Sequence, residues 1–408
     1  MSVNFVEIAL EESPIYDGAP SAAPYRVSTN KLYLPARSAR LVPDVQHLDR
    51  SDELRGIPGA PARLVDAYLP AGALSVRAYA QLLTWLFELA GFQGAVTAGG
   101  ATVTGVEQTA VVGVNALNSA TINVVSTDGF ASAGTIIIGG AAVTYTGKTA
   151  TSFTGCGAHA AYSGGEIVND NVPVGASKWV FTKREAVDAQ TAQIIINYRR
   201  QAQKLVGNGY GVSSLSLTAL GELTADLMGL LFKRQAVDTT TVPAYPSQSI
   251  PPFRRRELRL TGLAGGGRFA DFGVTITNPL ERVFSLGLGT PTPFPDAMEH
   301  GDEQVAVTGS MPKRVLDPDD LDALLSGATF AADARWRSTS NIGATNAPYA
   351  LRIDMPACQY VGGAPGEMGN QRRHGLDDVS FFAGWSEAAG YDCRITLVND
   401  VTAIKTFA

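Results

Sequence analysis

The chain has 408 residues, of which 45% are hydrophobic and 17% charged, and its formal net charge is −6 at pH 7. This apolar content excludes a disordered chain, and the length is sufficient for about two or three compact cores. The negative charge argues against a protein that grips nucleic acid over a broad basic face, and the 43 glycines and 22 prolines favour a turn-rich β protein.

The N-terminal region is predicted to combine one strand with a long arm. Val3 to Glu11 has the composition of a β-strand, whereas Ser13 to Pro70 is rich in proline and scattered charges. We expect this second segment to be an extended arm with little regular structure, either a flexible surface excursion or a functional contact arm. The first residues contain neither the basic leader nor the apolar segment of a secretion signal. Together with three widely spaced cysteines, this favours synthesis in a reducing cytosol.

The clearest predicted element is a helix over Val76–Ala90, with Ser75 as its N-cap and Gly91 as its stop. Apolar residues cover most of its circumference, and polar residues interrupt them often enough to exclude a membrane span. Such a helix is buried on more than one side. A neighbouring subunit is the preferred second cover, and a second sheet of the same chain is the alternative. The candidate assembly residues on this helix are Val76, Tyr79, Trp85 and Phe87.

Residues Gly94 to Val168 differ in composition from the sequence on either side. They contain three acidic residues, one lysine and no arginine, and small or β-branched residues make up nearly all of the rest. Short strands are predicted around Asp128-Gly129 and Gly139-Gly140. Insertions are tolerated where a chain leaves and re-enters a scaffold at a surface loop. We therefore predict a discontinuous body, residues 1–93 and 169–408, that carries an inserted small all-β module at 94–168.

The sequence after the module alternates between apolar and polar residues in several segments, as half-buried strands do. A second, shorter helix is predicted over about 318–326, with Asp317 as its N-cap, Pro318 at its first position and Gly327 as its stop. The predicted fold class is therefore mainly β, a β-sandwich or barrel with two helices plus the inserted module. The predicted strands are Gln193–Tyr198, Gly211–Ala219, Glu222–Phe232, Arg254–Thr261, Phe269–Thr277, Glu303–Met311, Tyr349–Met355, Asp378–Trp385 and Tyr391–Val398.

The sequence contains no group of residues that predicts catalysis, a metal site or a cofactor site. The four histidines lack partners at metal-ligand spacing, and the motifs of serine hydrolases and phosphate-binding loops are absent. Gly207 to Gly211 lies between predicted strands and is interpreted as a turn. Cys156 near His159 lacks a third group that would orient the histidine, and a helix N-terminus explains the acidic run from Asp317. We therefore expect no enzyme activity and no cofactor.

One basic cluster, formed by Arg254, Arg255, Arg256 and Arg259, is the only place where phosphates are expected to be held. Strand periodicity puts Arg255, Glu257 and Arg259 on one face, which predicts a solvated or subunit-bridging ladder. These three residues complete the set of candidate assembly residues. A nucleic-acid role for the cluster is the less favoured alternative.

The order of the segments is informative. The helix is followed by V-F-T and a strand, then by G-Y-G-V-S-S-L-S-L-T-A, F-G-V-T-I-T-N, a V-T-G strand, L-R-I-D-M-P and F-F-A-G-W. This order resembles the major tail tube proteins of long, non-contractile-tailed bacteriophages, the siphophage type. Gly209–Ala219 and Thr275–Leu280 carry most of the likeness, which covers about residues 70–93 and 172–400. The module, through V-V-S-T-D-G-F and Y-T-G-K-T-A-T-S-F-T-G-C, is similar to a small repeat-type module of several phage virion proteins.

The resemblance implies a structural virion protein, made in the cytoplasm of the bacterial host, whose subunits form stacked hexameric rings. These rings build the hollow tail tube that delivers DNA. The implied partners are other copies, the tape-measure protein, and the tail terminator and tip proteins, without membrane insertion. A long loop and terminal arms join the rings in this family, and Ser13–Pro70 and Asn399–Ala408 are the matching segments. The alternative is a carbohydrate- or host-surface-binding virion module acting through 94–168; an enzyme ranks third.

Overall fold

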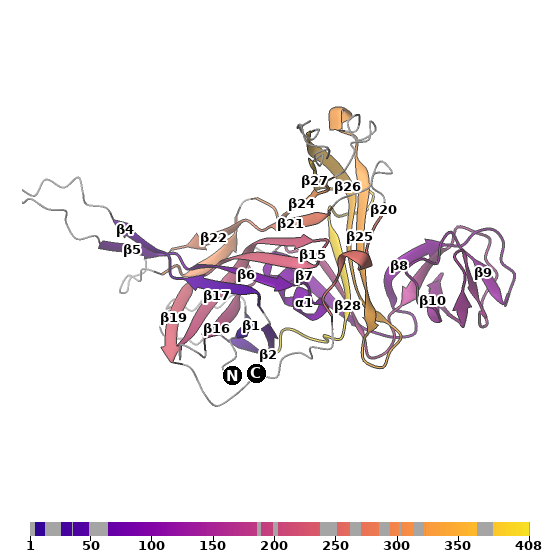
Figure 1. The fold of residues 1–408 in the computed structure, drawn as a ribbon, viewed down its shortest axis with the longest axis horizontal. Coiled ribbons are helices and arrows are strands. Elements are labelled where there is room, and N and C mark those ends of the chain that lie inside the picture. The colour runs from indigo at the N-terminus through magenta and orange to yellow at the C-terminus, as the bar shows by residue number, and fades with distance from the viewer. Residues whose placement is uncertain are drawn as a thin grey trace, which may run out of the picture.

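The computed structural model describes residues 5–12, 26–34, 36–48, 64–185, 189–198, 203–236, 251–261, 271–284, 294–301, 303–312, 322, 324–364 and 378–407 (Figure 1). Strands dominate this part of the chain, so the predicted mainly β fold is confirmed. The strands form sheets of the body and separate, smaller sheets at 104–171. No sheet made by the described residues closes into a barrel.

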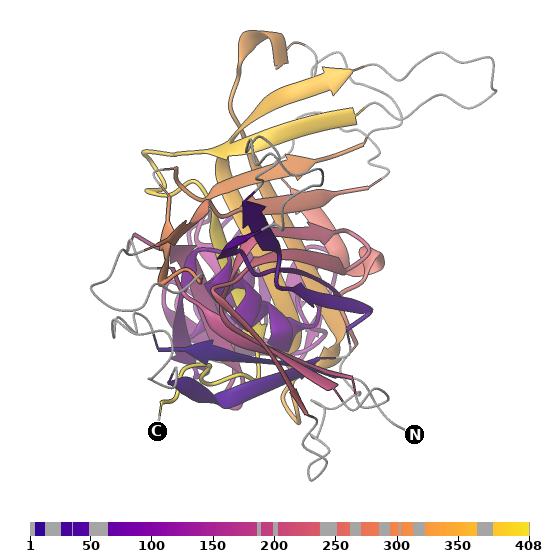
Figure 2. The ribbon, with the colours of Figure 1, turned by 90° about the vertical axis from the view of Figure 1, so that its left-hand side faces the viewer.

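The first sheet of the body is antiparallel, with the order β2–β1–β16–β17–β19. Its strands are β1 (Phe5–Glu11), β2 (Val27–Leu34), β16 (Ala192–Tyr198), the start of β17 (Gln203–Thr218) and β19 (Leu231–Ala236). In Figure 2, β1 and β2 lie at the bottom of the molecule, beside the yellow C-terminal segment. The predicted N-terminal strand is therefore confirmed, and it lies between two neighbours rather than at an edge.

β17 is 16 residues long and belongs to two sheets. Gln203 to Asn208 pair with β19, and Gly211 to Leu217 pair with β18. The predicted turn at Gly207–Gly211 is therefore wrong, because the chain continues through it as a strand. Gly209 has a φ of +67°, which glycine adopts without a steric penalty, and its N–H donates to the Glu11 carboxylate at 2.9 Å.

The second sheet continues from β17 in both directions, and every pair in it is antiparallel. On one side lie β18, β6 and β3; on the other lie β21, β24, β27 and β26. The strands are β3 (Ser38–Val42), β6 (Ala71–Arg77), β18 (Glu222–Met228), β21 (Gly273–Thr277), β24 (Ala306–Ser310), β26 (Pro348–Ala364) and β27 (Asp378–Gly384).

β26 divides this sheet a second time. Its first half pairs with β28 and its second half with β27, while β25 pairs along its opposite edge. β28 is followed by β15 and β7, and β25 is followed by β20. These strands are β7 (Phe92–Ala98), β15 (Ser177–Lys183), β20 (Leu258–Thr261), β25 (Phe330–Asn341) and β28 (Arg394–Asn399).

The helix α1 (Ala80–Leu89) packs in the angle between these branches, against β7, β15, β17, β26 and β28. Gly91, with a φ of +87°, follows its last turn, as predicted. The predicted start is wrong: Val76 lies in β6, which pairs with β18 along its whole length, and Tyr79 rather than Ser75 is the N-cap. The second helix is described only at 322 and 324–326, and Gly327 follows with a φ of +65°. Its predicted N-cap, Asp317, lies outside the described residues.

The predicted arm at Ser13–Pro70 contains regular strands wherever it is described. β2 hydrogen-bonds to β1 and β3 to β6, and Leu32 and Leu41 are buried in the main core. β4 (Val45–Leu48) pairs with β5 (Leu64–Tyr68), and this pair projects from one end of the body in Figure 1. The prediction of little regular structure is wrong here, because pairing with neighbouring strands outweighs the proline-rich composition. Another two-stranded sheet joins β22 (Leu280–Val283) to β23 (Ala297–His300).

The module lies at the opposite side of the body from β4 and β5 (Figure 1). It has one sheet of order β11–β10–β14–β8 and another of order β12–β13–β9, with its own apolar core around Phe153. The predicted borders cut through strands: β7 runs past Gly94 in the body sheet, and β14 runs past Val168 in the module. The strands are β8 (Thr104–Ala110), β9 (Thr121–Asn123), β10 (Gly134–Ile138), β11 (Ala141–Tyr145), β12 (Gly147–Lys148), β13 (Ser152–Thr154) and β14 (Ile167–Asn171).

The substitution Phe87→Ala is expected to lower the free energy of unfolding by about 3–5 kcal/mol, because it leaves a cavity in the core. The Phe87 side chain is 1% exposed, and its ring centroid lies 5.4 Å from that of Phe181. Urea unfolding followed by tryptophan fluorescence measures the loss. Phe284→Ala, at a side chain that is 47% exposed, is the control and should change stability by less than about 1 kcal/mol. Equal losses in the two variants would contradict the burial of α1.

Candidate functional site: assembly surfaces and the module junction

The helix residues predicted for assembly are covered by their own chain. Val76 and Phe87 are 1% exposed and Trp85 is 5% exposed, whereas Tyr79 is half-buried at the start of α1. The body sheets of the same chain enclose this helix. A neighbouring subunit as its second cover is therefore wrong, and the alternative, a sheet of the same chain, holds.

The described part of the C-terminal segment also lies against its own chain. Ile404 is buried, and the N–H of Thr406 donates to Ser28 Oγ at 3.0 Å. Lys405 Nζ lies 3.0 Å from Glu88 Oε2, and Arg184 also binds this oxygen, at 2.9 Å. Glu88 is buried on α1, so its carboxylate ties the helix to this segment. The segment proposed for contact between rings is therefore engaged within one subunit.

Arg255, Glu257 and Arg259 do not form the predicted ladder. Arg255–Glu257 is a short 3-10 turn, η2, and the strand β20 begins only at Leu258. The Glu257 carboxylate is buried and accepts the N–H groups of Arg254 at 3.0 Å and Thr339 at 3.3 Å. Arg255 is exposed, while Arg259 reaches the module. The prediction is wrong because the turn breaks the alternation that would place the three residues on one face.

Glu107 of the module is buried where the module meets the body. Its carboxylate contacts Arg259 of β20 and lies 3.5 Å from Arg335 of β25. Asp128, which is exposed, lies 3.5 Å from Arg259 and adds a second, weaker ion pair. A buried carboxylate between two arginines fixes the orientation of both partners, because each charge is costly to leave alone in a dry site.

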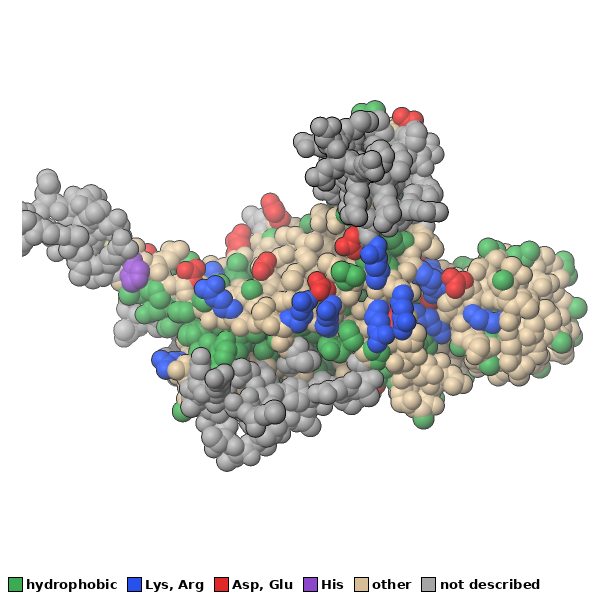
Figure 3. All heavy atoms as spheres, viewed as in Figure 1, with side chains coloured by type: hydrophobic (Ala, Val, Ile, Leu, Met, Phe, Trp, Pro, Cys, Tyr) green, Lys and Arg blue, Asp and Glu red, His purple; other side chains and the backbone are tan. Residues whose placement is uncertain are grey.

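The arginine side of this junction continues as a ladder of ion pairs across β25, β26 and β28. Asp333 pairs with Arg335 and, at 2.9 Å, with Arg352; Asp354 lies 3.6 Å from Arg352 and 3.2 Å from Arg394. The module strand β8 lies beside β26 and β28. Figure 3 shows Lys and Arg side chains gathered on the body next to the module. The contact between module and body therefore combines these ion pairs with an apolar contact, since Val106 of β8 is buried in the core of the body.

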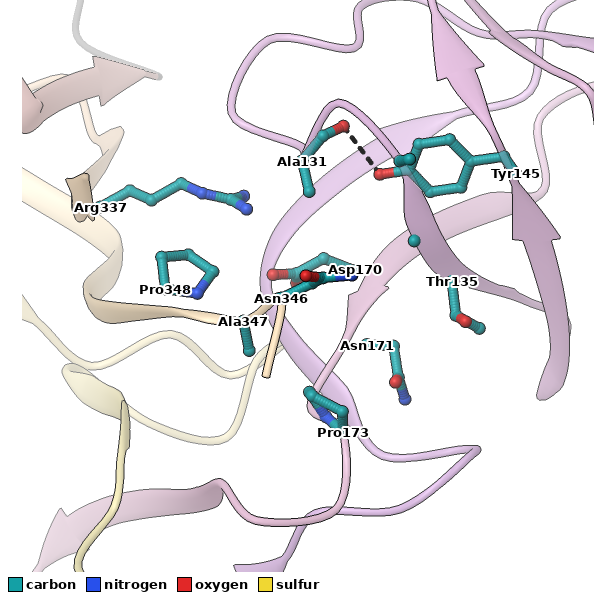
Figure 4. A pocket seen from close by; sticks show the side chains of 12 residues that line it. Ala131, Thr135, Tyr145, Asp170, Asn171, Pro173, Arg337, Asn346, Ala347 and Pro348 are labelled. Atoms are coloured by element: carbon teal, nitrogen blue, oxygen red, sulfur yellow. Dashed lines mark hydrogen bonds between the residues drawn. The ribbon is translucent and has the colours of Figure 1, made fainter. Parts of the chain in front are cut away.

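A cavity of about 150 Å³ lies in the same junction (Figure 4). Tyr145, Asp170 and Asn171 of the module line it together with Arg337 and Asn346 of the body. Burial raises the pKa of Asp170 to about 7, with a smaller contribution from Glu107 and an opposing one from Arg337. Arg337 Nη1 is buried without a hydrogen-bond partner in the structure. The junction thus contains a carboxyl that titrates near neutral pH and polar space beside it.

The strand β7 has an unpaired outer edge. Among the strands that the structure describes it pairs with β15 alone, and residues Ala95–Ala98 are all exposed. The Gly94 N–H points away from β15 and donates to Glu88 Oε1 at 2.9 Å, so the alternate residues Val96 and Ala98 direct their backbone groups outward too. Within the described chain, those two residues have no hydrogen-bond partner at that edge. This edge was not predicted from the sequence, because β7 crosses the border assigned to the module.

Cys156 and His159, which lie close together in the sequence, each contact backbone oxygens in the structure. The His159 ring bonds to the backbone oxygens of Ala160 and Ser119, while Cys156 lies near Phe153 O and its pKa is raised by burial. No group of three His, Cys, Asp or Glu side chains among them is placed to hold a metal ion. The helices in the described ranges are too short or too polar to cross a membrane.

No protein-family model matches this chain, and no curated protein matches it. Among solved structures, the crystal structure of a Pseudomonas aeruginosa FadL homologue aligns with 97% of this chain and 88% of its own length, at 9% identity and a TM-score of 0.09. A likeness at this level carries no argument about the fold or the function.

Glu107→Gln is expected to destabilise the protein by about 1.5–3 kcal/mol, because it removes a buried charge shared by two arginines, while Asp128 and Asp333 remain beside them. Asp128→Asn is the matched control, since it removes the exposed partner of the same Arg259 and should cost at most about 1 kcal/mol. Thermal and urea unfolding of both variants measure the difference. A small effect of both substitutions would show that the junction does not depend on Glu107.

Asp170→Asn is expected to remove part of the pH dependence of stability. The pKa of Asp170 is raised on folding from 3.8 to about 7, so folding favours its protonated form. Its contribution to stability is complete below about pH 4 and is lost as the pH rises through 7. The asparagine keeps the acceptor for the Glu107 N–H and does not ionise. The free energy of unfolding is to be measured for both proteins at pH 5 and pH 8. At pH 8 the variant should be more stable than the parent, and equal stability would contradict the assignment.

Proposed function

We propose that this protein is a structural subunit that assembles with copies of itself into stacked rings. These rings form the tail tube of a long, non-contractile-tailed bacteriophage, a conduit for DNA. The order of segments in the sequence supports the proposal, and the net charge of −6 suits a conduit because a lumen that bound phosphates tightly would stall moving DNA. The tape-measure, terminator and tip proteins are the further partners of such a tube.

The observation that carries the proposal is the unpaired edge of β7. This edge strand has seven residues, and its exposed segment Ala95–Ala98 contains no charge and no proline. A long, uncharged edge with free backbone groups pairs readily with another strand, and monomeric proteins usually block such edges. Pairing with a different edge of the next copy is a head-to-tail contact, which generates a ring when the rotation closes.

Stacking of rings requires a second contact along the tube axis. The pair β4–β5 projects from the body at the end away from the module (Figure 1). A projecting two-stranded element reaches a neighbouring ring without disturbing the body sheets. The pair β4–β5 would therefore make the contact between rings that the sequence analysis assigned to the whole of Ser13–Pro70. The strands β2 and β3 of that segment belong to the body.

Val96→Pro is expected to abolish assembly and to leave the subunit folded. The substitution removes an outward N–H and places the proline ring at the edge, where a neighbouring strand would lie. Sedimentation velocity and negative-stain electron microscopy of the parent and the variant measure assembly, and circular dichroism measures folding.

Ala95→Pro is the matched control for this experiment. The Ala95 N–H points towards β15, so this variant should damage the body sheet itself and lower the melting temperature. Normal tubes from Val96→Pro would remove the β7 edge from assembly. A parent protein that stays monomeric at every concentration would contradict the tube and favour the alternative, a virion module that binds carbohydrate or the host surface.

A further inference from the structure

Two carboxylates face each other on the small sheet of β22 and β23. Glu281 and Glu299 are directly opposite in the antiparallel register, and Glu281 is exposed while Glu299 is half-buried. Side chains in such positions lie on the same face with Cβ atoms about 5 Å apart, so two like charges repel. Glu303, also exposed, follows β23. The ion pairs of the described residues include none of these three carboxylates.

At η2, basic side chains rather than acidic ones lie next to one another. Arg254, Arg255 and Arg256 are consecutive and all exposed. The carboxylate within the turn, Glu257, is turned inward and accepts backbone N–H groups, so it does not neutralise the outer surface of the turn. Arg254 and Arg256 have no ion-pair partner in the described chain. These two arginines therefore leave positive charge at the surface of the turn, although the whole chain is acidic.

The two patches lie apart on one subunit. β22 lies in the part of the body that leads to β4 and β5, whereas β20, which directly follows η2, lies beside the module (Figure 1). Figure 3 shows the same separation, with acidic side chains over the first region and Lys and Arg over the second. One subunit therefore cannot neutralise its own pair of patches. A second copy in head-to-tail orientation presents an acidic patch to a basic patch, and the same contact repeats without limit or closes into a ring.

We propose that the basic turn Arg254–Arg256 of one copy binds the acidic pair Glu281–Glu299 of the next copy. This inference rests on the proposed function, because it names a contact between subunits of the assembly. The contact removes a like-charge repulsion on each side and forms charge-assisted pairs, so complementary charges select the partner edge and exclude symmetric face-to-face dimers.

Charge reversal on each side tests the contact. Arg254→Glu/Arg256→Glu and Glu281→Lys/Glu299→Lys are each expected to raise the concentration needed for assembly about tenfold or more. A 1:1 mixture of the two variants restores opposite charges at every contact, and assembly should return. Lys233→Glu/Arg234→Glu on the exposed end of β19 is the control for the arginine reversal, with the same change of net charge at another place, and should assemble like the parent. Circular dichroism confirms that each variant is folded.

The outcomes separate this contact from the proposed function. If the parent assembles and the reversed variants assemble equally well, the charged contact is wrong while the tube subunit stands. Loss of assembly in each variant without recovery in the mixture also overturns the contact, because the losses then have another cause. If the parent never assembles, the proposed function fails first, and the contact fails with it.

Discussion

The enclosure of α1 between the branches of the body sheet is the packing on which the other features depend. The long strand β17 belongs to two sheets, β26 divides the second of them, and the angle between the branches is filled by the apolar sides of the helix. Because the helix is covered completely by its own chain, the surface available to a partner is moved to the sheet edges. Glu88, the charged residue on the buried helix, connects this interior to β7 and to the C-terminal segment.

The module junction follows a different physical rule from the body core. Each part has its own apolar core, although Val106 of β8 packs in the core of the body, and Glu107, the arginine ladder and a polar cavity lie between the two parts. Charged contacts are directional and respond to salt and pH, while apolar burial does not distinguish orientations as sharply. The module is therefore oriented by a few specific ion pairs in addition to this apolar contact. This difference explains how a module with an almost uncharged sequence contributes to a charged interface, since one glutamate meets two arginines of the body.

The sequence was sufficient for elements with local signatures and insufficient for pairings between distant residues. The alternation of apolar and polar residues predicted the strands β18 and β27. The apolar stretch that ends at Gly91 predicted the helix α1 and the residue at which it stops. The start of that helix was misplaced because Val76 has helical spacing to Tyr79 and Ala80, although it lies in the strand β6. The contact between Glu107 and Arg259 joins residues 152 positions apart, and no local pattern records it. The passage of β17 from one sheet to another was likewise hidden, since its glycine-rich middle, Gly207 to Gly211, has the composition of a turn.

The connections of the module leave the body from two neighbouring paired strands. β7 ends at Ala98 and β15 begins at Ser177, and these two residues are partners in the antiparallel ladder. A pull on the module is therefore delivered to the adjacent ends of two paired strands and draws both in the same direction. Such a load acts along the ladder between β15 and β28, so many hydrogen bonds resist it at once. Glu107 and its arginines carry part of the load in parallel, so tension on the module is shared between this ladder and the charged pairs of the junction.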